Sequence, residues 1–196
     1  MSSDEFDFAA FMSSYIEDLT AAMHSLNPDD VSGLYNEMLS VMDNGGCVHF
    51  IGNGGSAATP SHSAGDWSKE LKLPTLCHTD NIASLTAWAN DTDYSNIFVG
   101  QLQTWLKSGD LLVAYSGSGN SANVINGVEF AKEAGARTVG ITGNYRRGNG
   151  GNLAKLADVA IVCNTESMER IEDLQLIINH IVKEAIKASR NIPSHS

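Results

Sequence analysis

Apolar residues in the first part of the chain recur at the spacing of one helix face. They are three or four residues apart, which predicts an amphipathic helix, and they occur at Phe8, Phe11, Met12, Tyr15, Leu19 and Met23. The same pattern over residues 31–42 predicts a second helix, with Asp29 or Asp30 as its N-terminal cap and Gly45-Gly46 at its end. The chain therefore begins with two helices, over residues 1–45.

Strand and helix patterns alternate through the rest of the chain. Helical patterns fill most of the intervals between short apolar runs typical of buried strands, at residues 47–51, 74–78, 110–115, 137–141 and 159–163. The alternation predicts an α/β fold, a three-layer αβα sandwich with a five-stranded parallel sheet over residues 46–190, preceded by the N-terminal helices. Those two helices exceed what one face of a small sheet needs. We expect them to belong to the same domain and to form part of an oligomer interface.

A loop of small residues follows the third strand pattern. Between an apolar run and a helical segment lies the sequence Ser116-Gly117-Ser118-Gly119-Asn120-Ser121. Glycines let the backbone approach an anion closely, and serine hydroxyls and the free N–H groups of a helix start can donate hydrogen bonds to it. This arrangement is typical of phosphate-binding loops.

A second loop repeats the design after the first strand pattern. That pattern ends at Ile51 and is followed by Gly52-Asn53-Gly54-Gly55-Ser56 and another helical segment. One such loop alone is as often a tight turn between strand and helix as a binding site. Open α/β sheets bind ligands beyond the carboxyl ends of their strands, where both loops must lie. The pair therefore favours a phosphorylated small molecule as ligand.

The helical segment after the loop of residues 52–56 carries His62 and Asp66, which are four residues apart and so share one face. The helix start is ambiguous, because Ser56 is a possible cap but Thr59-Pro60 is the stronger local signal. A histidine and a carboxylate at this spacing can bind a divalent metal ion or act as an acid/base pair. Taken alone, such a pair is more often a surface salt bridge.

The last long helix, predicted over residues 167–189, carries Glu169, Glu172 and His180. A single histidine among apolar helix positions is usually a core or interface residue. Glu172 and His180 are separated by eight residues, about 12 Å along an ideal helix. For one ion to bind both, the helix must start late or bend, or a neighbouring subunit must contribute.

Charge excludes one class of partner. The 196-residue chain has a formal net charge of −11, and the resulting long-range field repels a nucleic acid. A phosphate ligand must then be held by local N–H groups and hydroxyls rather than by a basic patch. The pair Arg146-Arg147 is a candidate phosphate clamp, but a solvated flexible loop is the commoner interpretation of such a pair.

The remaining composition predicts a cytoplasmic protein. Cys47, Cys77 and Cys163 lie in or beside apolar runs without metal-ligand spacing, as expected of buried, reduced thiols. Residues 1–5 are acidic and lack a signal pattern, and no apolar run approaches membrane-spanning length. We expect no membrane partner, and a disordered tail over residues 191–196.

Five sets of residues, in order along the chain, resemble one known family. They are residues 50–58, His62 with Asp66, residues 85–91, residues 116–124, and residues 170–172 followed by His180. Together they are similar to the phosphoheptose isomerases of the sugar isomerase (SIS) superfamily. The resemblance implies a homotetramer with active sites between subunits. It also implies conversion of D-sedoheptulose 7-phosphate to D-glycero-D-manno-heptose 7-phosphate, supported by zinc, in heptose biosynthesis for lipopolysaccharide.

The resemblance also implies roles for individual residues. The substrate would be bound by Asn53, Gly54, Gly55, Ser56, Asp91, Ser116, Gly117, Ser118, Ser121, Glu169 and Glu172. One Zn²⁺ per subunit would be held by His62, Asp66, Glu172 and His180. In the isomerisation, Asp66 would remove a proton and His180 would transfer one to the neighbouring oxygen through an enediolate. Phosphate contacts would position the reacting carbons.

The chain departs from the family pattern at four of these positions. The family usually has glutamate at Asp66, glutamine at Glu172, aspartate at Glu169, and threonine or serine at Gly117. Aspartate shortens the carboxylate by one methylene and so moves the base, and Glu172 adds a charge that favours a cation. Two histidines and two carboxylates still suit zinc. The alternative function is a non-catalytic SIS protein that senses phosphosugars or associates with a replication initiator.

Overall fold

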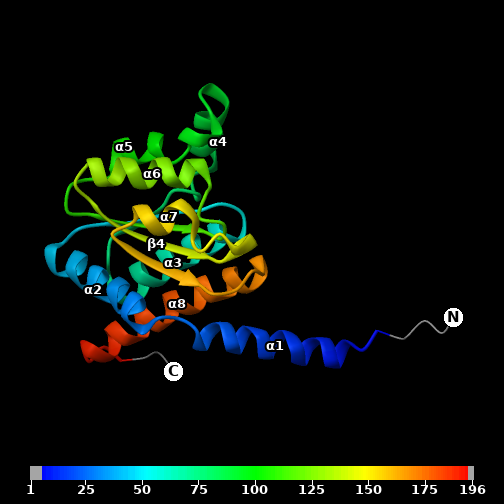
Figure 1. Ribbon diagram of the computed structural model, residues 1–196. Helices are drawn as coiled ribbons and strands as arrows, with labels where there is room; N and C mark the ends of the chain where they lie inside the picture. Colours follow the sequence, from blue (N-terminus) through cyan, green and yellow to red (C-terminus); the bar gives the residue numbers. More distant parts are fainter. Residues whose placement is uncertain (1–5, 194–196) are drawn as a thin grey trace.

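A parallel sheet with helices on both faces forms the body of the computed structural model, which describes residues 6–193 (Figure 1). The sheet order is β2-β1-β3-β4-β5, and every neighbouring pair is parallel. The strands are β1 (Val48–Ile51), β2 (Thr75–Cys77), β3 (Leu111–Ser116), β4 (Arg137–Gly143) and β5 (Val159–Cys163). The predicted five-stranded parallel sheet is confirmed. From β1 the chain goes to β2 on one side and then to β3 on the other side, so the strand order reverses between β1 and β3. Open parallel sheets bind their ligands at such a point, beyond the carboxyl ends of the strands.

Two layers of helices cover the sheet. One face holds α2 (Pro28–Asn44), α3 (Gly55–Leu71) and α8 (Met168–Ser189) (Figure 1). The other holds α4 (Ile82–Asp91), α5 (Val99–Trp105), α6 (Ala122–Glu133) and α7 (Gly151–Leu156), and short turns of 3₁₀ helix lie at Tyr94–Asn96 and Tyr145–Arg147. Side chains alternate between the two cores, as a strand requires: in β3, Val113 packs on the first face and Leu112 on the second.

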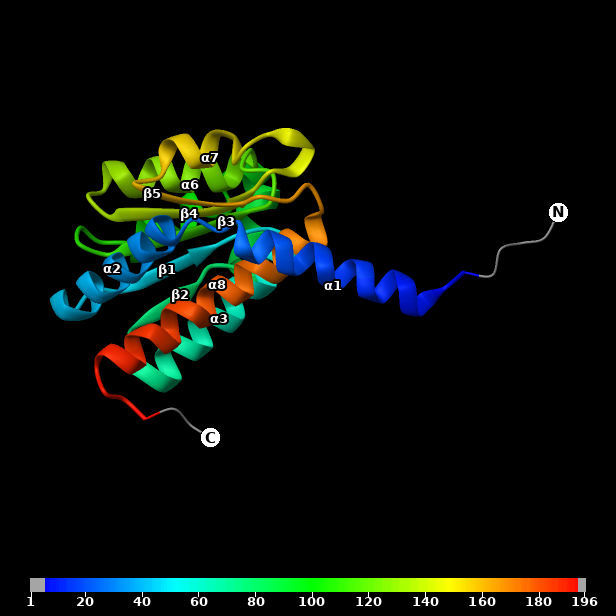
Figure 2. The ribbon, with the colours of Figure 1, turned by 60° about the horizontal axis from the view of Figure 1, so that its bottom comes forward.

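The two N-terminal helices behave differently. The second helix, α2, packs Leu34, Met38 and Val41 into the first core. The first helix, α1 (Phe8–His24), extends away from the body over most of its length (Figure 2). Its large exposed apolar residues are Phe8, Phe11, Met12 and Ile16. Much of its apolar face is therefore not covered within one chain.

The ends of α2 correct one prediction. The helix begins at Pro28 and is capped by Asn27, whose side chain accepts a hydrogen bond from the backbone of Asp29. Neither Asp29 nor Asp30 is the cap. Both lie in the first turn, where a negative charge interacts favourably with the positive end of the helix dipole. The predicted end is confirmed, because Gly45 adopts a left-handed conformation after the last turn.

The start of α3 corrects another. The helix begins at Gly55, directly after Gly54 with φ of 58°, and Pro60 lies inside it. Thr59-Pro60 is therefore not the helix start. A proline inside a helix donates no hydrogen bond to the carbonyl four residues earlier, here that of Ser56. That carbonyl lies against Gly52, where a Cβ atom would collide with it.

All three cysteines lie within the described residues. Cys77 and Cys163 are buried as predicted, but Cys47 is only half-buried, and all three are free thiols.

Residues 1–5 and 194–196 lie outside the described residues. In the predicted disordered tail, the backbone N–H groups of Asn191 and Ile192 donate to the last turn of α8. Among residues 6–193, no helix is both long and apolar enough to cross a membrane.

Candidate active site

The loop after β3 is held by hydrogen bonds to its own serine residues. Gly119, with φ of +66°, donates its backbone N–H to both the carbonyl and the hydroxyl oxygen of Ser116, at 3.1 Å each. The Ser116 hydroxyl also lies 3.3 Å from that of Ser121. Ser121 is the N-cap residue of α6, yet its side chain makes no capping hydrogen bond. The Ser121 hydroxyl therefore caps no N–H group of α6, and a hydroxyl beside the free N–H groups of a helix start is the kind of donor set that an anion site requires.

The loop after β1 is joined to this loop by two asparagines. Asn53 donates its side-chain amide to Asn123 at 2.9 Å, and Asn123 donates in return at 2.8 Å. At the start of α3, the buried Ser56 hydroxyl donates to Gln175 of α8 at 2.8 Å. Sequence reasoning missed Asn123 and Gln175 as site residues. Their signal was weak, because each is a single amide within an otherwise regular helix.

The two loops share one cavity of about 280 Å³. It is lined by Asn53, Gly54, Gly55, Ser56, Tyr115, Ser116, Gly117, Ser118, Ser121, Met168 and Glu172. The structure thus brings together nearly all the residues predicted to bind substrate. A larger hollow of about 650 Å³ lies beside the edge strand β2, but neither glycine-rich loop lines it.

Two predicted substrate residues do not line this cavity. Asp91 is exposed on α4, where Asn90 donates to it, and it lines a separate hollow with Trp88. Glu169 is exposed in the first turn of α8 and accepts a hydrogen bond from the Ser167 hydroxyl at 2.9 Å. Within one chain, neither side chain joins the residues that the two loops assemble. Arg146 and Arg147 are also exposed and absent from the cavity, and Arg147 pairs with Glu166.

Glu172 of α8 lines the cavity, and its side chain reaches the N-terminal end of α3. Its carboxylate packs so closely on Gly55 that a Cβ atom there would collide with it. Burial raises the pKa of Glu172, and the negative charges of Glu169 and Asp173 raise it further. The absence of a side chain at Gly55 therefore leaves the space that the Glu172 carboxylate occupies.

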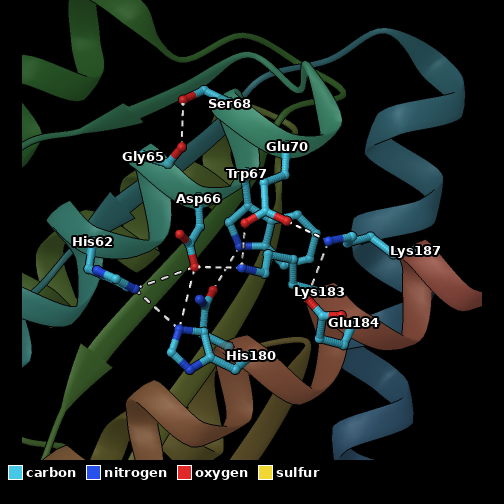
Figure 3. Close-up of polar contacts among 11 residues, drawn as sticks. His62, Gly65, Asp66, Trp67, Ser68, Glu70, His180, Lys183, Glu184 and Lys187 are labelled. Atoms are coloured by element: carbon cyan, nitrogen blue, oxygen red, sulfur yellow. Dashed lines mark hydrogen bonds and ion pairs between the residues drawn. The ribbon is translucent and has the colours of Figure 1, made fainter. Parts of the chain in front are cut away.

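A second cluster lies farther along the same two helices (Figure 3). His62 of α3 and His180 of α8 bring their Nε2 atoms to within 3.2 Å, and each Nε2 lies 3.4 Å from Oδ2 of Asp66. The ligand atoms of these three residues lie within 4.8 Å of one another. Imidazole nitrogens and a carboxylate oxygen are the donors that zinc prefers in proteins. The residues therefore fit a divalent metal ion.

Glu172 is not part of this three-residue cluster, contrary to the predicted set of four ligands. The reason is helix geometry. The eight positions from Glu172 to His180 correspond to about 12 Å along α8, and the Glu172 side chain lines the loop cavity instead. Within one chain, Glu172 belongs to the loop cavity.

Two lysines continue this cluster along the helices. Lys183 donates to Asp66 at 2.9 Å and to Glu70 at 3.0 Å, and Lys187 donates to Glu70 at 2.6 Å. Hydrogen bonds from Lys187 and Lys183 lower the pKa of Glu70 to about 2. Sequence reasoning missed both lysines and Glu70. The signal was present, because His62, Asp66 and Glu70 are spaced by four residues along one helix face.

Comparison with known proteins gives the class to which this fold and site belong. Residues 14–143 match the family model of the SIS domain. The chain therefore belongs to the SIS domain family.

Individual relatives narrow the assignment to the phosphoheptose isomerase branch of that family. The chain is 37% identical over 176 residues to a probable phosphoheptose isomerase of Thermoplasma volcanium, covering 87% of this chain and 88% of the relative. It is 37% identical over 149 residues to the phosphoheptose isomerase of Aneurinibacillus thermoaerophilus, with 74% and 73% covered. The solved phosphoheptose isomerase of Neisseria gonorrhoeae superimposes with a TM-score of 0.82 at 29% identity, covering 92% and 96% of the two chains.

Proposed function

We propose that this protein is an aldose–ketose isomerase that converts D-sedoheptulose 7-phosphate to D-glycero-D-manno-heptose 7-phosphate. The observation that carries the proposal is the placement of two sites along α3 and α8. The N-terminal ends of these helices meet the glycine-rich loops, and His62, Asp66 and His180 lie about two to three turns farther on. The names and coverage of the relatives support the same activity.

The separation of the two sites favours a long substrate. The loop cavity offers serine hydroxyls and helix N-termini, which suit a phosphate group. The cluster of two histidines and one carboxylate offers groups that accept and donate protons near neutral pH. A molecule that binds both at once must carry its phosphate and its reacting carbons at opposite ends. A seven-carbon sugar phosphate in an extended form has this shape.

The chemistry follows from the cluster. Asp66 removes the proton from the hydroxyl-bearing carbon next to the carbonyl group, which gives an enediolate, and returns a proton to the former carbonyl carbon. His180 takes the proton from the hydroxyl oxygen and delivers it to the former carbonyl oxygen. His62, Asp66 and His180 are the residues that would hold a Zn²⁺ ion, which when bound polarises a carbonyl oxygen as a Lewis acid. Phosphate binding at the loops contributes by holding the reacting carbons beside Asp66.

The predicted roles of Glu172 and Asp91 require a second subunit. We propose a homotetramer in which the exposed apolar face of α1 packs between subunits, so that residues of one chain complete the site of another. Asp91, and Glu172 as a metal ligand, would take their predicted roles at such an interface. The protein would act in the cytoplasm, in heptose biosynthesis for lipopolysaccharide.

The test is incubation with a panel of ketose and aldose phosphates in heavy water, followed by NMR. We expect deuterium to enter sedoheptulose 7-phosphate at the carbon next to the carbonyl, with formation of the aldose. Five- and six-carbon sugar phosphates should react far more slowly. Binding of a sugar phosphate without exchange or turnover would instead support a non-catalytic SIS protein and overturn the proposal.

A further inference from the structure

A lysine is buried directly beside the proposed catalytic carboxylate. The Lys183 side chain is only 8% exposed, and its ammonium group lies between Asp66 and Glu70 (Figure 3). Taking an ammonium group out of water is unfavourable unless it is paired and hydrogen-bonded. Two carboxylates at 2.9 and 3.0 Å satisfy this need. Both carboxylates belong to α3, so contacts with that helix fix the position of the Lys183 ammonium group.

The contacts form a chain of alternating charge. Lys187, whose side chain is 3% exposed, binds the other carboxylate oxygen of Glu70 at 2.6 Å. The order is Asp66, Lys183, Glu70, Lys187, and Lys187 also lies 3.5 Å from Glu184 of its own helix. Each inner group has an opposite charge on both sides. Rotation of any one side chain would break two favourable contacts or leave a buried charge unpaired.

Oδ2 of Asp66 is the point at which this chain meets the proposed catalytic cluster. The same atom that accepts from Lys183 lies 3.4 Å from Nε2 of both His62 and His180. Proton transfer by a carboxylate depends on its placement to within about 1 Å. A donor on this oxygen therefore determines where the proposed base lies relative to both imidazoles.

We propose that Lys183 is a positioning residue for Asp66. Its ammonium group holds the short aspartate side chain between His62 and His180, and Glu70 holds the ammonium group in turn. The inference rests on the proposed isomerase function for its catalytic meaning. Its structural content, the fixed orientation of Asp66, stands independently of that function.

The experiment compares Lys183→Met with Lys187→Met. Both variants replace a buried lysine of α8 by an unbranched apolar side chain, and both remove one partner of Glu70, but only the first removes a partner of Asp66. We expect Lys183→Met to lower kcat by about 100-fold, the typical effect of misplacing a catalytic group, with KM within about threefold because the phosphate loops are remote. Lys187→Met should leave both constants within about threefold of wild type.

A second measurement needs neither turnover nor metal. The side-chain ¹⁵N resonances of His62 and His180, recorded at fixed pH without added metal, report the position of Asp66 between the two rings. They should shift in Lys183→Met and remain in place in Lys187→Met. Thermal melting checks that both variants fold, and Glu70→Gln serves as a milder variant that should lower kcat less than Lys183→Met.

The outcomes separate this inference from the proposed function. If wild type isomerises no sugar phosphate, the function is wrong, and the imidazole resonances alone decide whether Lys183 orients Asp66. If wild type is active but Lys183→Met has the kcat and imidazole resonances of Lys187→Met, the positioning role is overturned. Equal loss in both lysine variants would mean that the lysines serve only to stabilise α3 against α8.

Discussion

Asn53 and Asn123 exchange two side-chain hydrogen bonds, at 2.9 and 2.8 Å, and so join the loop after β1 to the first turn of α6. Asn123 is 2% exposed and also accepts from the backbone N–H of Val124 at 3.0 Å. The Tyr94 hydroxyl donates at 3.1 Å to the same Oδ1 atom of Asn53 that accepts from Asn123. The pair fixes the distance between the two loops that line the cavity.

Asn123→Ala should therefore weaken phosphosugar binding. The change leaves the Nδ2 donor of Asn53 without its acceptor, at a cost of about 1–3 kcal/mol, and lets the two loops separate. We expect KM to rise about tenfold or more, with a smaller change in kcat. Asn126→Ala is the control, since Asn126 lies on the same helix but donates to the backbone of Ser95. Steady-state kinetics with both variants decide the question, and equal KM values would contradict a role for the asparagine pair.

Gly117 offers a second test of the phosphate loop. Its φ is not in the positive range, so no special backbone conformation requires glycine, but a Cβ atom there would collide with the sulfur of Met168. Because a thioether end can move aside, Gly117→Thr should fold with a small loss of melting temperature. The added hydroxyl should lower KM for the sugar phosphate.

The double variant Gly117→Thr, Met168→Ala separates the two effects. Removing the methionine should restore the melting temperature while the lower KM persists. If Gly117→Thr changes neither KM nor melting temperature, position 117 contacts no phosphate and the interpretation of this loop position is wrong.

The cluster of His62, Asp66 and His180 predicts the behaviour of bound metal. Purified protein should contain a divalent ion, measurable by elemental analysis, and chelation should lower activity. His62→Ala should reduce metal content and activity together, because it removes one of three donors. His24→Ala removes an exposed histidine of α1 and should change neither quantity. Full activity in metal-free wild type would exclude a metal from the reaction.

Asp66→Asn should abolish turnover without unfolding the protein. The amide keeps the size of the carboxylate but cannot accept the substrate proton, so we expect a loss of at least about 100-fold in kcat. His180→Ala should have a comparable effect. Wild-type rates in either variant would remove the assigned roles, and circular dichroism confirms that the fold is retained.

A buried histidine pair predicts how stability depends on pH. Nδ1 of His49 lies 2.9 Å from Nε2 of His78, and His49 also contacts Asp110. Burial and, to a lesser degree, the neighbouring His49 together lower the pKa of His78 to about 3. Its ordinary value is about 6.5. The unfolded chain therefore takes up a proton below pH 6.5 that the folded protein binds only near pH 3.

The contribution of His78 to the free energy of unfolding should be fully present above about pH 6.5. It should fall as the pH drops toward 3, at up to about 1.4 kcal/mol per pH unit for this one proton. Denaturant titrations from pH 7.5 to 4.5 measure the slope. His78→Gln should reduce the slope by about one proton, whereas His24→Ala should retain it. An unchanged slope in His78→Gln would show that another group controls acid stability.

The exposed face of α1 predicts the oligomer. Ile16 is 53% exposed, and an aspartate there would place a charge in an apolar subunit interface. Ile16→Asp should dissociate the proposed tetramer in light scattering, whereas Ser14→Asp, on the opposite side of α1, should leave the assembly intact. A monomeric wild type would contradict the proposed assembly.

The sequence by itself determined the elements and the two glycine-rich loops. Apolar runs and helical spacing located five strands to within a residue or two, because both signals depend only on near neighbours. The spacing of His62 and Asp66 likewise placed both on one helix face. Local signals failed where tertiary context decides, as at Pro60, which looks like a helix start but lies inside α3.

Only the tertiary structure decided which distant residues meet. The contact of Lys183 with Asp66 spans 117 positions of sequence and exists because the strand order places α3 and α8 side by side on one face of the sheet. The same packing brings His180 to His62 and leaves Glu172 in the loop cavity. A periodic pattern specifies which face of a helix is buried but not which helix covers it, so these pairs could not be read from sequence alone.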